Sequence, residues 1–442
     1  MGNHNEVFFS MEADIVYKVL EKNNFKLTTD SRKVADGELF FALKGDNFNG
    51  NEFAAAALEK GAIAAVIDDP AYESPGTIVV DDVTATLQAV AMKYRDELDI
   101  PVLAVTGSNG KTTTKEMLAR VLSDKFRVHY TRGNLNNHIG VPLTLLACPR
   151  DAGFMIVEMG ANHKGEIREL CRIARPGYGL VTNIGRAHLE GFASFEGVVE
   201  AKSELYDYLE STGGWVFYNE DNDLLAKILA ARKINKVSYK HPGKHRLSVI
   251  RTGHDPTLEL LAEIDGMKYT FRTNLFGEYN LENLLAGLSV GLYFDIKPRA
   301  MQQAIEEYEP DNNRSQVLNT GKNTLICDSY NANPDSMIGA IEAFRQYRGE
   351  NKVIILGDML ELGQYELKEH KKILEELASS RDDLKIIVVG RIFSALAPSY
   401  SLLSFESRVQ LEEYLEDEPI RDSLVLVKAS RALGLEKIYG LL

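Results

Sequence analysis

The chain has 442 residues, 45% of them hydrophobic, and its 64 acidic and 50 basic side chains give a formal net charge of −14. That length suggests about three domains, and the acidic balance argues against a general nucleic-acid-binding protein. The longest apolar runs, such as 62–67, are far too short to span a bilayer as a helix.

Cysteine usage and the first residues bear on the compartment. Cys148, Cys171 and Cys327 lie far apart in apolar contexts, which indicates buried thiols in a reducing environment. The first 20 residues carry three acids and no basic segment before an apolar stretch, so we expect no signal peptide. We therefore expect a cytoplasmic monomer with neither a membrane nor a nucleic acid as its partner.

Residues 1–98 are predicted to form a small mixed α/β domain. The apolar run at 38–43 predicts a buried strand, and 77–80 predicts another. Residues 51–67 indicate a helix, a stop at a glycine and a further strand, and 81–98 begin with two acids and continue with helical periodicity.

Residues 99–312 are predicted to form a central domain with a mostly parallel sheet. Strand-like and helical segments alternate, which is typical of β-α units. The strands are expected within 101–105, 154–160, 178–185, 213–219 and 236–239, with helices at 164–174, 195–211, 280–294 and 297–308. Two alternating runs around Asp265 and Gly266 predict an antiparallel hairpin appended to that sheet.

Residues 313–442 alternate again and predict a doubly wound, Rossmann-like domain, so the fold class is α/β with three domains. The expected strands lie within 323–330, 352–359, 384–390 and 423–430. The expected helices start at Pro334 and lie near 366–380 and 407–416.

The loop "TGSNGKTTT" at 106–114 follows an apolar strand and precedes a helix. Gly107 and Gly110 let backbone N–H groups converge on phosphate oxygens, and the helix dipole adds to the attraction. Lys111 can reach the β- and γ-phosphates, while the Thr112 hydroxyl can ligate Mg²⁺. The loop departs from the common pattern G-x-x-x-x-G-K-[ST], because Val105 stands where that pattern has its first glycine. It has the shorter pattern T-G-x-x-G-K-T. The alternative is a glycine-rich turn without a ligand.

Three further side chains are expected near this loop. Glu158 ends a strand, where a carboxylate can ligate Mg²⁺, although it could also be an ordinary surface acid. His188 lies in a loop after another strand, and a lone histidine is otherwise usually structural. Lys202 lies on an apolar helix face, which is costly unless it has a role, a partner or a route for its tip to solvent. The alternative to a functional role is a surface ion pair with Glu200 or Glu204.

Amide-rich loops supply candidate substrate contacts. "GNLNNHIG" contains three asparagines that suit a sugar or phosphate-rich ligand, or an ordinary turn. "DSYNANPDSM" at 328–337 places Asp328 at a strand end, where it could bind a ribose, and Asn333 before a proline, where it could simply cap a helix. The glycine-bracketed "GDMLELG" at 357–363, followed by His370 on a helix, is expected to bind something other than the nucleotide.

Together these stretches resemble the Mur ligase family, the ATP-dependent amide ligases of peptidoglycan synthesis. The motifs that carry the resemblance stand in family order along the whole chain: "TGSNGKTTT", "EMGANHKGEI", "TNIGRAHLEGF", "EAKSEL", "GEYNLENLLAG" and "DSYNANP". "DSYNANPDSM", "GDMLELG" and "GNLNNHIGVPLTLL" most resemble the members that join D-alanyl-D-alanine to UDP-N-acetylmuramoyl-tripeptide.

The resemblance implies a role for each region. The first domain would hold the UDP end of the muramoyl substrate, the central domain ATP and two Mg²⁺ ions, and the third domain would close over them with the dipeptide. Implied ATP contacts are Gly107, Ser108, Asn109, Gly110, Lys111, Thr112, Thr113, Asn283, Arg314 and Asp328. Implied catalytic residues are Lys111, Glu158, His188 and Lys202, and implied metal ligands are Thr112, Glu158, His188 and a carbamylated Lys202. Implied substrate contacts are Ser31, Arg32, Asn47, Asn134, Asn136, Asn137, Asn331 and Asn333. One departure is Ala429, where the resemblance predicts glycine, so contacts of Lys428 and Arg431 are not carried over.

Three alternatives remain at this point. Another Mur-type or folylpolyglutamate-type ligase would share the central domain, and "DSYNANPDSM" and "GDMLELG" would distinguish it. A nucleotide-dependent switch protein would hydrolyse ATP without a dipeptide, and a non-catalytic carbohydrate-binding module would give Lys111 and Thr112 no purpose. The sequence leaves open whether the third peptide residue is diaminopimelate or lysine.

Overall fold

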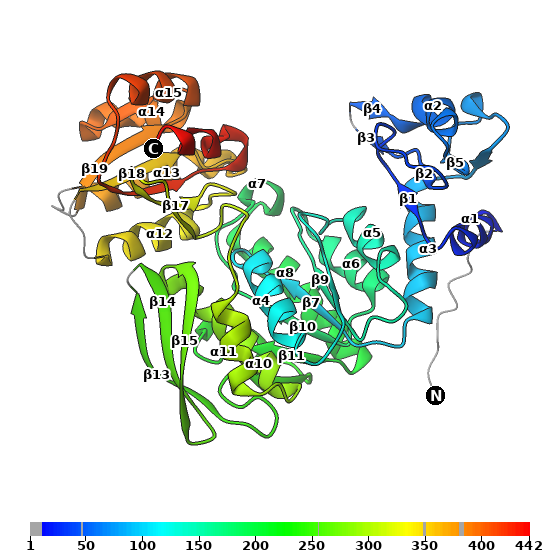
Figure 1. The fold of residues 1–442 in the computed structure, drawn as a ribbon, viewed down its shortest axis with the longest axis horizontal. Coiled ribbons are helices and arrows are strands. Elements are labelled where there is room, and N and C mark those ends of the chain that lie inside the picture. The colour runs from blue at the N-terminus through cyan, green and yellow to red at the C-terminus, as the bar shows by residue number, and fades with distance from the viewer. Residues whose placement is uncertain (1–10, 46, 255, 348–350, 380–383) are drawn as a thin grey trace.

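The computed structural model describes residues 11–442 except for 46, 255, 348–350 and 380–383. Three lobes follow one another along the chain in Figure 1, and we refer to them as the N-terminal lobe (11–98), the central lobe (99–312) and the C-terminal lobe (313–442). Within the described ranges, no helix is long and apolar enough to cross a membrane.

The N-terminal lobe holds a four-stranded parallel sheet in the order β1-β2-β5-β6. Its strands are β1 (Leu27–Thr28), β2 (Leu39–Phe41), β5 (Ala64–Ile67) and β6 (Thr77–Val79), with a small hairpin of β3 (Lys44–Gly45) and β4 (Phe48–Asn49). Its helices are α1 (Met11–Lys22), α2 (Ala54–Glu59) and α3 (Val83–Glu97), with short 3-10 turns at Gly50–Phe53 and Pro70–Tyr72. The predicted helix–stop–strand pattern at 51–67 is therefore confirmed.

Helix α3 connects the N-terminal lobe to the central lobe, as its position in Figure 1 indicates. The Asp82 carboxylate caps its first turn by accepting from the Ala85 N–H. Near its other end the Tyr94 hydroxyl donates to the Cys148 carbonyl at 2.6 Å, and Arg95 Nε donates to the Ala174 carbonyl at 3.0 Å. These buried and half-buried contacts attach the helix to the central lobe.

The central lobe contains a six-stranded sheet in the order β12-β11-β10-β7-β9-β8, and every pair in it is parallel. Its strands are β7 (Val102–Thr106), β8 (Val128–Tyr130), β9 (Phe154–Glu158), β10 (Tyr178–Val181), β11 (Trp215–Tyr218) and β12 (Asn235–Ser238). Its helices are α4 (Lys111–Leu122), α5 (Gly140–Leu146), α6 (Glu166–Ala174), α7 (Leu189–Phe192), α8 (Phe195–Thr212), α9 (Asp223–Ala230), α10 (Leu281–Tyr293) and α11 (Pro298–Glu306), with a 3-10 turn at Glu278–Asn280. The buried strands explain the continuous apolar runs in the sequence.

The predicted hairpin is present, but its expected place in the parallel sheet is wrong. Strands β13 (Leu247–His254), β14 (Thr257–Ile264) and β15 (Met267–Phe276) are antiparallel, and Asp265 and Gly266 turn with φ of 51° and 82°. They do not pair with the six-stranded sheet. Instead Leu275 of β15 pairs with Gln316 of the C-terminal lobe, so one nine-stranded sheet spans both lobes. Pairing between distant segments is invisible to local periodicity. Strand β13 was not predicted, because a bulge between Val249 and Arg251 interrupts its alternation.

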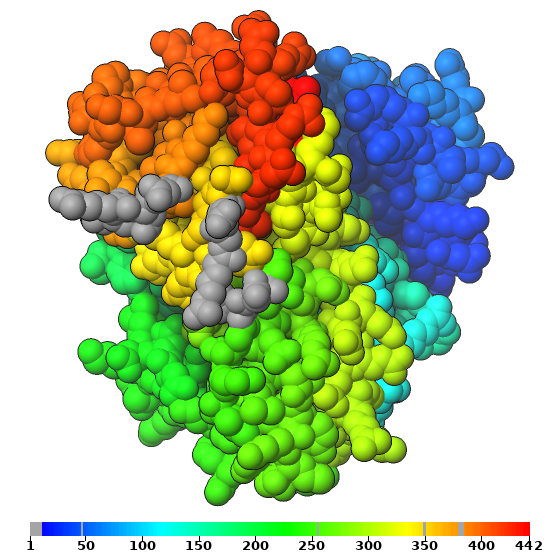
Figure 2. Space-filling model, turned by 60° about the vertical axis from the view of Figure 1, so that its left-hand side comes forward, coloured from blue at the N-terminus to red at the C-terminus, as the bar shows by residue number. Residues whose placement is uncertain are grey.

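The C-terminal lobe continues that sheet in the order β16-β17-β21-β18-β19-β20, parallel except for β16 against β17. Its strands are β16 (Gln316–Asn319), β17 (Thr324–Asp328), β18 (Lys352–Gly357), β19 (Leu384–Val389), β20 (Leu403–Phe405) and β21 (Leu424–Lys428). Its helices are α12 (Pro334–Gln346), α13 (Glu366–Ser379), α14 (Arg391–Leu396) and α15 (Arg408–Asp417), with 3-10 turns at Gly363–Tyr365, Ala397–Tyr400, Arg431–Leu433 and Leu435–Gly440. Figure 2 shows this lobe, in yellow to red, stacked above the green antiparallel strands.

Alternate residues of the C-terminal strands feed two separate cores, as the period of a strand requires. Ile354 and Leu356 of β18 belong to the core that includes α12 and α13. Val353 and Ile355 of the same strand belong to the core that includes α15. Helices therefore cover both faces of the parallel strands, which confirms the doubly wound prediction.

Candidate active site

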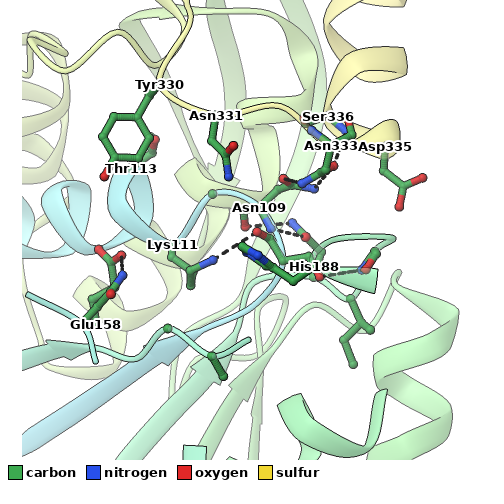
Figure 3. Close-up of a pocket in the computed structure, with 18 of the residues that line it drawn as sticks. Asn109, Lys111, Thr113, Glu158, His188, Tyr330, Asn331, Asn333, Asp335 and Ser336 are labelled. Carbon is green, nitrogen blue, oxygen red and sulfur yellow. Dashed lines mark hydrogen bonds between the residues drawn. The ribbon is translucent and has the colours of Figure 1, made fainter. Parts of the chain in front are cut away.

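A cavity of about 1350 Å³ lies where the central and C-terminal lobes face one another. The central lobe contributes residues at and after the ends of β7, β9 and β10, and the C-terminal lobe contributes residues after β17 and the last residue of β21. Ligands of open α/β sheets bind at these carboxyl ends of parallel strands. Figure 3 shows the side chains that line this cavity and converge from both lobes.

The loop at 106–114, which we call the phosphate loop, has backbone angles that suit the two glycines in it. Gly107 has φ of 141° and Gly110 has φ of 78°, both unfavourable for a residue with a side chain. A Cβ on Gly107 would lie 2.0 Å from Thr182 Oγ1, and one on Gly110 would lie 2.4 Å from Asn283 Oδ1. Helix α4 begins at Lys111 without a side-chain cap, so the N–H groups of its first turn have no such partner. The backbone angles and close packing of the loop therefore require glycine at these two positions.

Lys111 folds back onto this loop. Its Nζ donates to the Gly107 carbonyl at 2.7 Å and to the Ser108 carbonyl at 3.1 Å. Burial lowers its pKa to about 8, with the Glu158 carboxylate opposing that shift and Arg314 adding to it. In Figure 3 the side chain lies along the loop, with Glu158 to one side and His188 to the other.

Glu158, Thr112 and Asn136 come together at the end of β9. Glu158 Oε1 accepts from Thr112 Oγ1 at 3.2 Å and from Asn136 Nδ2 at 2.8 Å. The other oxygen, Oε2, is buried and accepts no hydrogen bond from the described residues. Burial raises the pKa of this carboxyl, but Lys115, Arg314 and Lys111 outweigh it and hold the pKa below its ordinary value. The carboxylate is thus ionised, and the Lys115 ammonium lies 3.4 Å from Oε2.

His188 links the two lobes. It has φ of 52°, and its Nδ1 contacts the Glu361 carboxylate of "GDMLELG". The contact with His188 holds the pKa of Glu361 below its ordinary value. Beside this pair the Glu190 N–H donates to the Glu361 carbonyl at 3.2 Å. The structure therefore places the predicted histidine against the C-terminal lobe as well as at the cavity.

Lys202 is buried on α8, with a side chain about 2% exposed. Its Nζ lies 5.3 Å from the centre of the Phe192 ring. Burial lowers its pKa to about 7, Lys111 lowers it further, and Glu166 and Glu204 oppose the shift. The alternative of a surface ion pair does not hold, because Glu200 pairs with Lys164 and Glu204 accepts from the N–H groups of Gly165 and Arg168.

Two asparagines join the phosphate loop to "DSYNANPDSM". Asn333 Nδ2 donates to Asn109 Oδ1 at 2.7 Å, and Asn109 Nδ2 lies 3.4 Å from Asn333 Oδ1. Asn333 also forms a capping box with Ser336 at the start of α12, as the structural alternative predicted. Asn331 points from the C-terminal lobe toward the loop in Figure 3. The amide pair thus connects the two lobes at the cavity.

Two more predicted ATP contacts, Asp328 and Arg314, have partners in the C-terminal lobe. Asp328 Oδ2 accepts from the buried Lys428 ammonium at 2.6 Å, and Oδ1 accepts from the Ser315 N–H at 3.2 Å. The Arg314 guanidinium lies 3.7 Å from the centre of the Tyr330 ring.

Asn283, another predicted ATP contact, packs against the phosphate loop. Its Oδ1 accepts from Thr114 Oγ1 at 2.9 Å, and its Nδ2 donates to Asn280 Oδ1 at 2.8 Å. All three residues line the cavity.

The predicted substrate contacts divide into two groups. Asn134, Asn136 and Asn137 line the cavity. Asn137 Oδ1 also accepts from the N–H groups that begin α5, which is the turn role of the alternative. Ser31, Arg32 and Asn47 lie in the N-terminal lobe outside that lining, with Arg32 exposed and paired with Asp30. The structure therefore does not bring this second group to the phosphate loop.

Two charged residues that contact the site residues were not predicted. Lys115 is fully buried, 3.4 Å from Glu158 Oε2. Arg186 donates to Asp335 and, at 3.1 Å, to Glu369, both in the C-terminal lobe. The helical position of Lys115, four residues after Lys111, is the only signal that the sequence offered. The pairing of Arg186 has no local signal.

The described residues contain no group of three or more histidine, cysteine, aspartate or glutamate side chains that could hold a metal ion. A metal at Glu158 would therefore need ligands of another kind, such as the Thr112 hydroxyl and the phosphates of a nucleotide. The arrangement belongs to the class of α/β proteins in which two lobes enclose a nucleotide at a phosphate loop.

Comparison with known proteins identifies the family. Three family profiles match in order: "Mur ligase family, catalytic domain" at 26–108, "Mur ligase middle domain" at 105–291 and "Mur ligase, glutamate ligase domain" at 313–431. The UDP-N-acetylmuramoyl-tripeptide–D-alanyl-D-alanine ligase of Bacillus subtilis is 34% identical over 426 residues, which cover 93% of this chain and 92% of the relative. The chain belongs to the Mur ligase family.

Solved structures agree in fold. A MurF crystal structure from Acinetobacter baumannii superposes with a TM-score of 0.85 at 28% identity, covering 96% of this chain and 97% of the other. MurF ligase from Thermotoga maritima, crystallised in complex with ADP, gives a TM-score of 0.80 at 26% identity, covering 95% and 97%. The likeness extends over all three lobes.

Proposed function

We propose that this protein is an ATP-dependent ligase that joins D-alanyl-D-alanine to the terminal carboxylate of UDP-N-acetylmuramoyl-tripeptide. The observation that carries the proposal is the contact between Asn109 of the phosphate loop and Asn333 of "DSYNANPDSM" at 2.7 Å. Through this contact, "DSYNANPDSM" lies beside the phosphate loop. That stretch is the one that distinguishes this ligase from other Mur-type and folylpolyglutamate-type ligases. The names of the relatives support the choice of substrates.

We assign one ligand to each part of the chain. Residues 1–98 would bind the UDP end through Ser31, Arg32 and Asn47, and 99–312 would bind ATP. Residues 313–442 would close on ATP and bind the dipeptide, with Asn331 and Asn333 as contacts. Asn134, Asn136 and Asn137 line the same cavity, and their amides suit the peptide of the muramoyl substrate.

ATP fits the phosphate loop for electrostatic reasons. Residues Gly107, Ser108, Asn109 and Gly110 lead into the uncapped first turn of α4, which contains Thr112 and Thr113 and whose backbone N–H groups would face the phosphates. The N–H groups of Ser108 and Asn109 donate to Asn183 and hold the loop in place. The Lys111 ammonium, held by two loop carbonyls, can exchange them for phosphate oxygens at little cost in geometry. Asn283, Arg314 and Asp328 line the rest of the cavity and would contact the remainder of the nucleotide.

Mg²⁺ fits the residues at the end of β9. The buried Glu158 Oε2 has no hydrogen-bond donor among the described residues, and Thr112 Oγ1 lies beside the other oxygen. Such oxygens are the ligands that Mg²⁺ prefers. Bound there, and at a second position near His188, the ion would neutralise phosphate charge and withdraw electrons from the γ-phosphorus.

Lys202 is proposed to reach that second position as a carbamate. Its buried amine has a pKa of about 7, so the neutral form that adds CO₂ is well populated at neutral pH. The carbamate would change the charge of the side chain from positive to negative and supply two oxygens. Two observations support this role over a surface ion pair: Lys202 is buried, and Glu200 and Glu204 have other partners, Lys164 and the Gly165 N–H respectively.

The reaction has two steps. A carboxylate oxygen of the tripeptide attacks the γ-phosphorus of ATP, the bond to the β,γ-bridging oxygen breaks, and ADP leaves behind an acyl phosphate. The free amine of D-alanyl-D-alanine then attacks the acyl carbon, loses its proton and expels inorganic phosphate from a tetrahedral intermediate. Two anions must approach in the first step, so Lys111 and Arg314 would stabilise the developing charge while the lobes fix the alignment.

Two alternatives predict different behaviour. Another Mur-type or folylpolyglutamate-type ligase would accept a different amine, and a nucleotide switch would hydrolyse ATP without either substrate. The decisive experiment measures phosphate release from ATP with and without UDP-N-acetylmuramoyl-tripeptide and D-alanyl-D-alanine. Release that requires both supports the proposal, whereas full-rate hydrolysis with neither present favours the switch. Tripeptides ending in diaminopimelate or lysine, tested in parallel, identify the third residue.

A further inference from the structure

Lys115 is a buried charge that the proposed reaction does not use. It lies on α4 one turn after Lys111, and its side chain is about 1% exposed. Its Nζ lies 3.4 Å from Glu158 Oε2 and 3.7 Å from Glu116 Oε1. A buried ammonium is costly unless anions surround it, so this placement depends on the two carboxylates.

Glu116 has other donors of its own. The Tyr308 hydroxyl donates to Glu116 Oε2 at 2.8 Å, and Asn312 Nδ2 donates to the same oxygen at 3.1 Å. Glu158 Oε2, by contrast, accepts no hydrogen bond from the described residues. Within the described part of the chain, Lys115 is the cation in ion-pair contact with the oxygen that we assign to Mg²⁺.

The charge around Glu158 is positive without a nucleotide. Lys115, Arg314 and Lys111 all act electrostatically on this one carboxylate. A divalent cation that approaches the carboxylate would meet three positive charges and one shielded oxygen. The phosphates of ATP would reverse this balance by adding several negative charges on the Lys111 side.

We propose that Lys115 is a positioning residue that makes metal binding depend on the nucleotide. Its ammonium holds Glu158 Oε2 as an internal counter-ion, so a free divalent cation is excluded and the ion enters with the phosphates of ATP. The inference rests on the proposed function, because it takes Glu158 to be a metal ligand.

The test measures Mn²⁺ binding rather than turnover. Free Mn²⁺ is quantified by electron paramagnetic resonance with the full-length protein, with and without a non-hydrolysable ATP analogue. The wild type should bind Mn²⁺ at this site only with the analogue. Lys115→Met and Lys115→Gln should bind free Mn²⁺ without it, about ten-fold or more tightly than the wild type, because a positive charge beside the ligand is removed.

Matched variants locate the effect. Adding Glu158→Gln to either Lys115 variant should abolish the gained binding, and Lys115→Arg should behave as the wild type. Arg120→Met removes the same charge from an exposed position on the same helix and should change nothing. Lys115→Gln guards against misfolding, since its amide can still donate to a carboxylate, and the melting temperature of each variant is measured alongside.

Two results would overturn the proposal. One is a wild type that binds free Mn²⁺ through Glu158 without the analogue, and the other is folded Lys115 variants that gain no binding. Failure of the wild type to bind Mn²⁺ even with the analogue would contradict the nucleotide site itself and remove the premise. Failure of the proposed function is thus distinguishable from failure of the Lys115 inference.

Discussion

Arg186 of the central lobe forms hydrogen bonds with Asp335 in the first turn of α12 of the C-terminal lobe. Arg186 Nη2 and Nε donate to Asp335 Oδ1 at 2.6 and 3.0 Å, and the Arg186 N–H donates to Oδ2 at 2.6 Å. A fourth hydrogen bond joins Arg186 Nη1 to the buried Glu369 at 3.1 Å. This cluster, the Asn109–Asn333 hydrogen bonds and the His188–Glu361 contact all join the central lobe to the C-terminal lobe around the cavity.

Arg186→Ala should loosen the contact between the lobes. Because the guanidinium forms several of the hydrogen bonds across the interface, its loss should favour open arrangements when no ligand is bound. Small-angle scattering should give a larger radius of gyration for the variant than for the wild type, and ATP analogue plus muramoyl substrate should compact both. Arg172→Ala, which removes a charge paired within α6, should leave the radius unchanged. An Arg186→Ala radius equal to that of the wild type would contradict the role of this cluster.

Lys111→Ala should lower turnover about a hundred-fold or more while leaving the fold intact. The ammonium bonds loop carbonyls rather than the core, so its role is to stabilise phosphate charge. Lys111→Arg should also be poor, because a planar guanidinium does not reproduce the geometry of a point charge. Steady-state phosphate release and circular dichroism check both variants. Wild-type turnover in Lys111→Ala would show that the phosphate loop is wrongly assigned.

Lys202→Ala should lose most activity, and added formate or acetate should restore part of it. A small carboxylate can occupy the space of the carbamate and supply the missing oxygens to the metal. Lys164→Ala, which removes a surface lysine paired with Glu200, is the control and should gain nothing from formate. Normal activity of Lys202→Ala without any additive would contradict the carbamate proposal. Electron density that ends at the Lys202 Nζ in a metal-loaded crystal of the wild type would also contradict it.

The space between residues 357 and 429 should hold only one of the two possible methyl groups, which Ala429 supplies. A Cβ on Gly357 would lie 2.6 Å from the Ala429 Cβ and 2.8 Å from Leu433 Cδ2, so alanine at 357 should overpack this buried site. Gly357→Ala should therefore lower the free energy of unfolding by about 1–3 kcal/mol. Urea denaturation measures the loss, and the exchanged pair Gly357→Ala with Ala429→Gly should recover most of it. No recovery in the exchanged pair would show that the strain lies elsewhere.

His370 should make stability depend on pH. Its Nδ1 lies 2.8 Å from the Glu366 carbonyl and its Nε2 accepts from the Met359 N–H at 2.9 Å, which fixes the neutral ring. Burial lowers its pKa below the ordinary 6.5, although Glu366, Asp358 and Glu369 oppose the shift. The unfolded chain then takes up the proton first. This contribution to stability is present above the unfolded pKa and is lost as pH falls toward the folded pKa.

His370→Leu isolates that contribution. The variant should be less stable near neutral pH because two buried hydrogen bonds are lost. Its free energy of unfolding, from urea titrations at several pH values, should fall less steeply between about pH 7 and pH 5 than that of the wild type. Equal slopes would mean that the imidazole does not titrate as the structure indicates.

Several features were determined by the sequence itself because they depend on neighbouring residues. The phosphate loop needs glycine where φ is positive, at Gly107 and Gly110, and its strand and helix adjoin it. The turn at Asp265 and Gly266 likewise follows from local backbone preference. The α/β class followed from the alternation of short apolar and helical segments. The sequence pattern also placed Glu158 at a strand end and His188 in the loop after another strand, at the sheet edge where the cavity lies.

Only the tertiary structure decided which distant groups meet. Local patterns gave Lys115 no partner, but packing buries it 3.4 Å from Glu158. They assigned the hairpin to the central sheet, whereas β15 pairs with β16 across the lobes. Local patterns were compatible with Lys202 either in a surface ion pair or as a buried amine, and the structure shows that Lys202 is buried. Backbone conformation depends on the few residues on either side, whereas the burial and pairing of a charge depend on every element that packs around it.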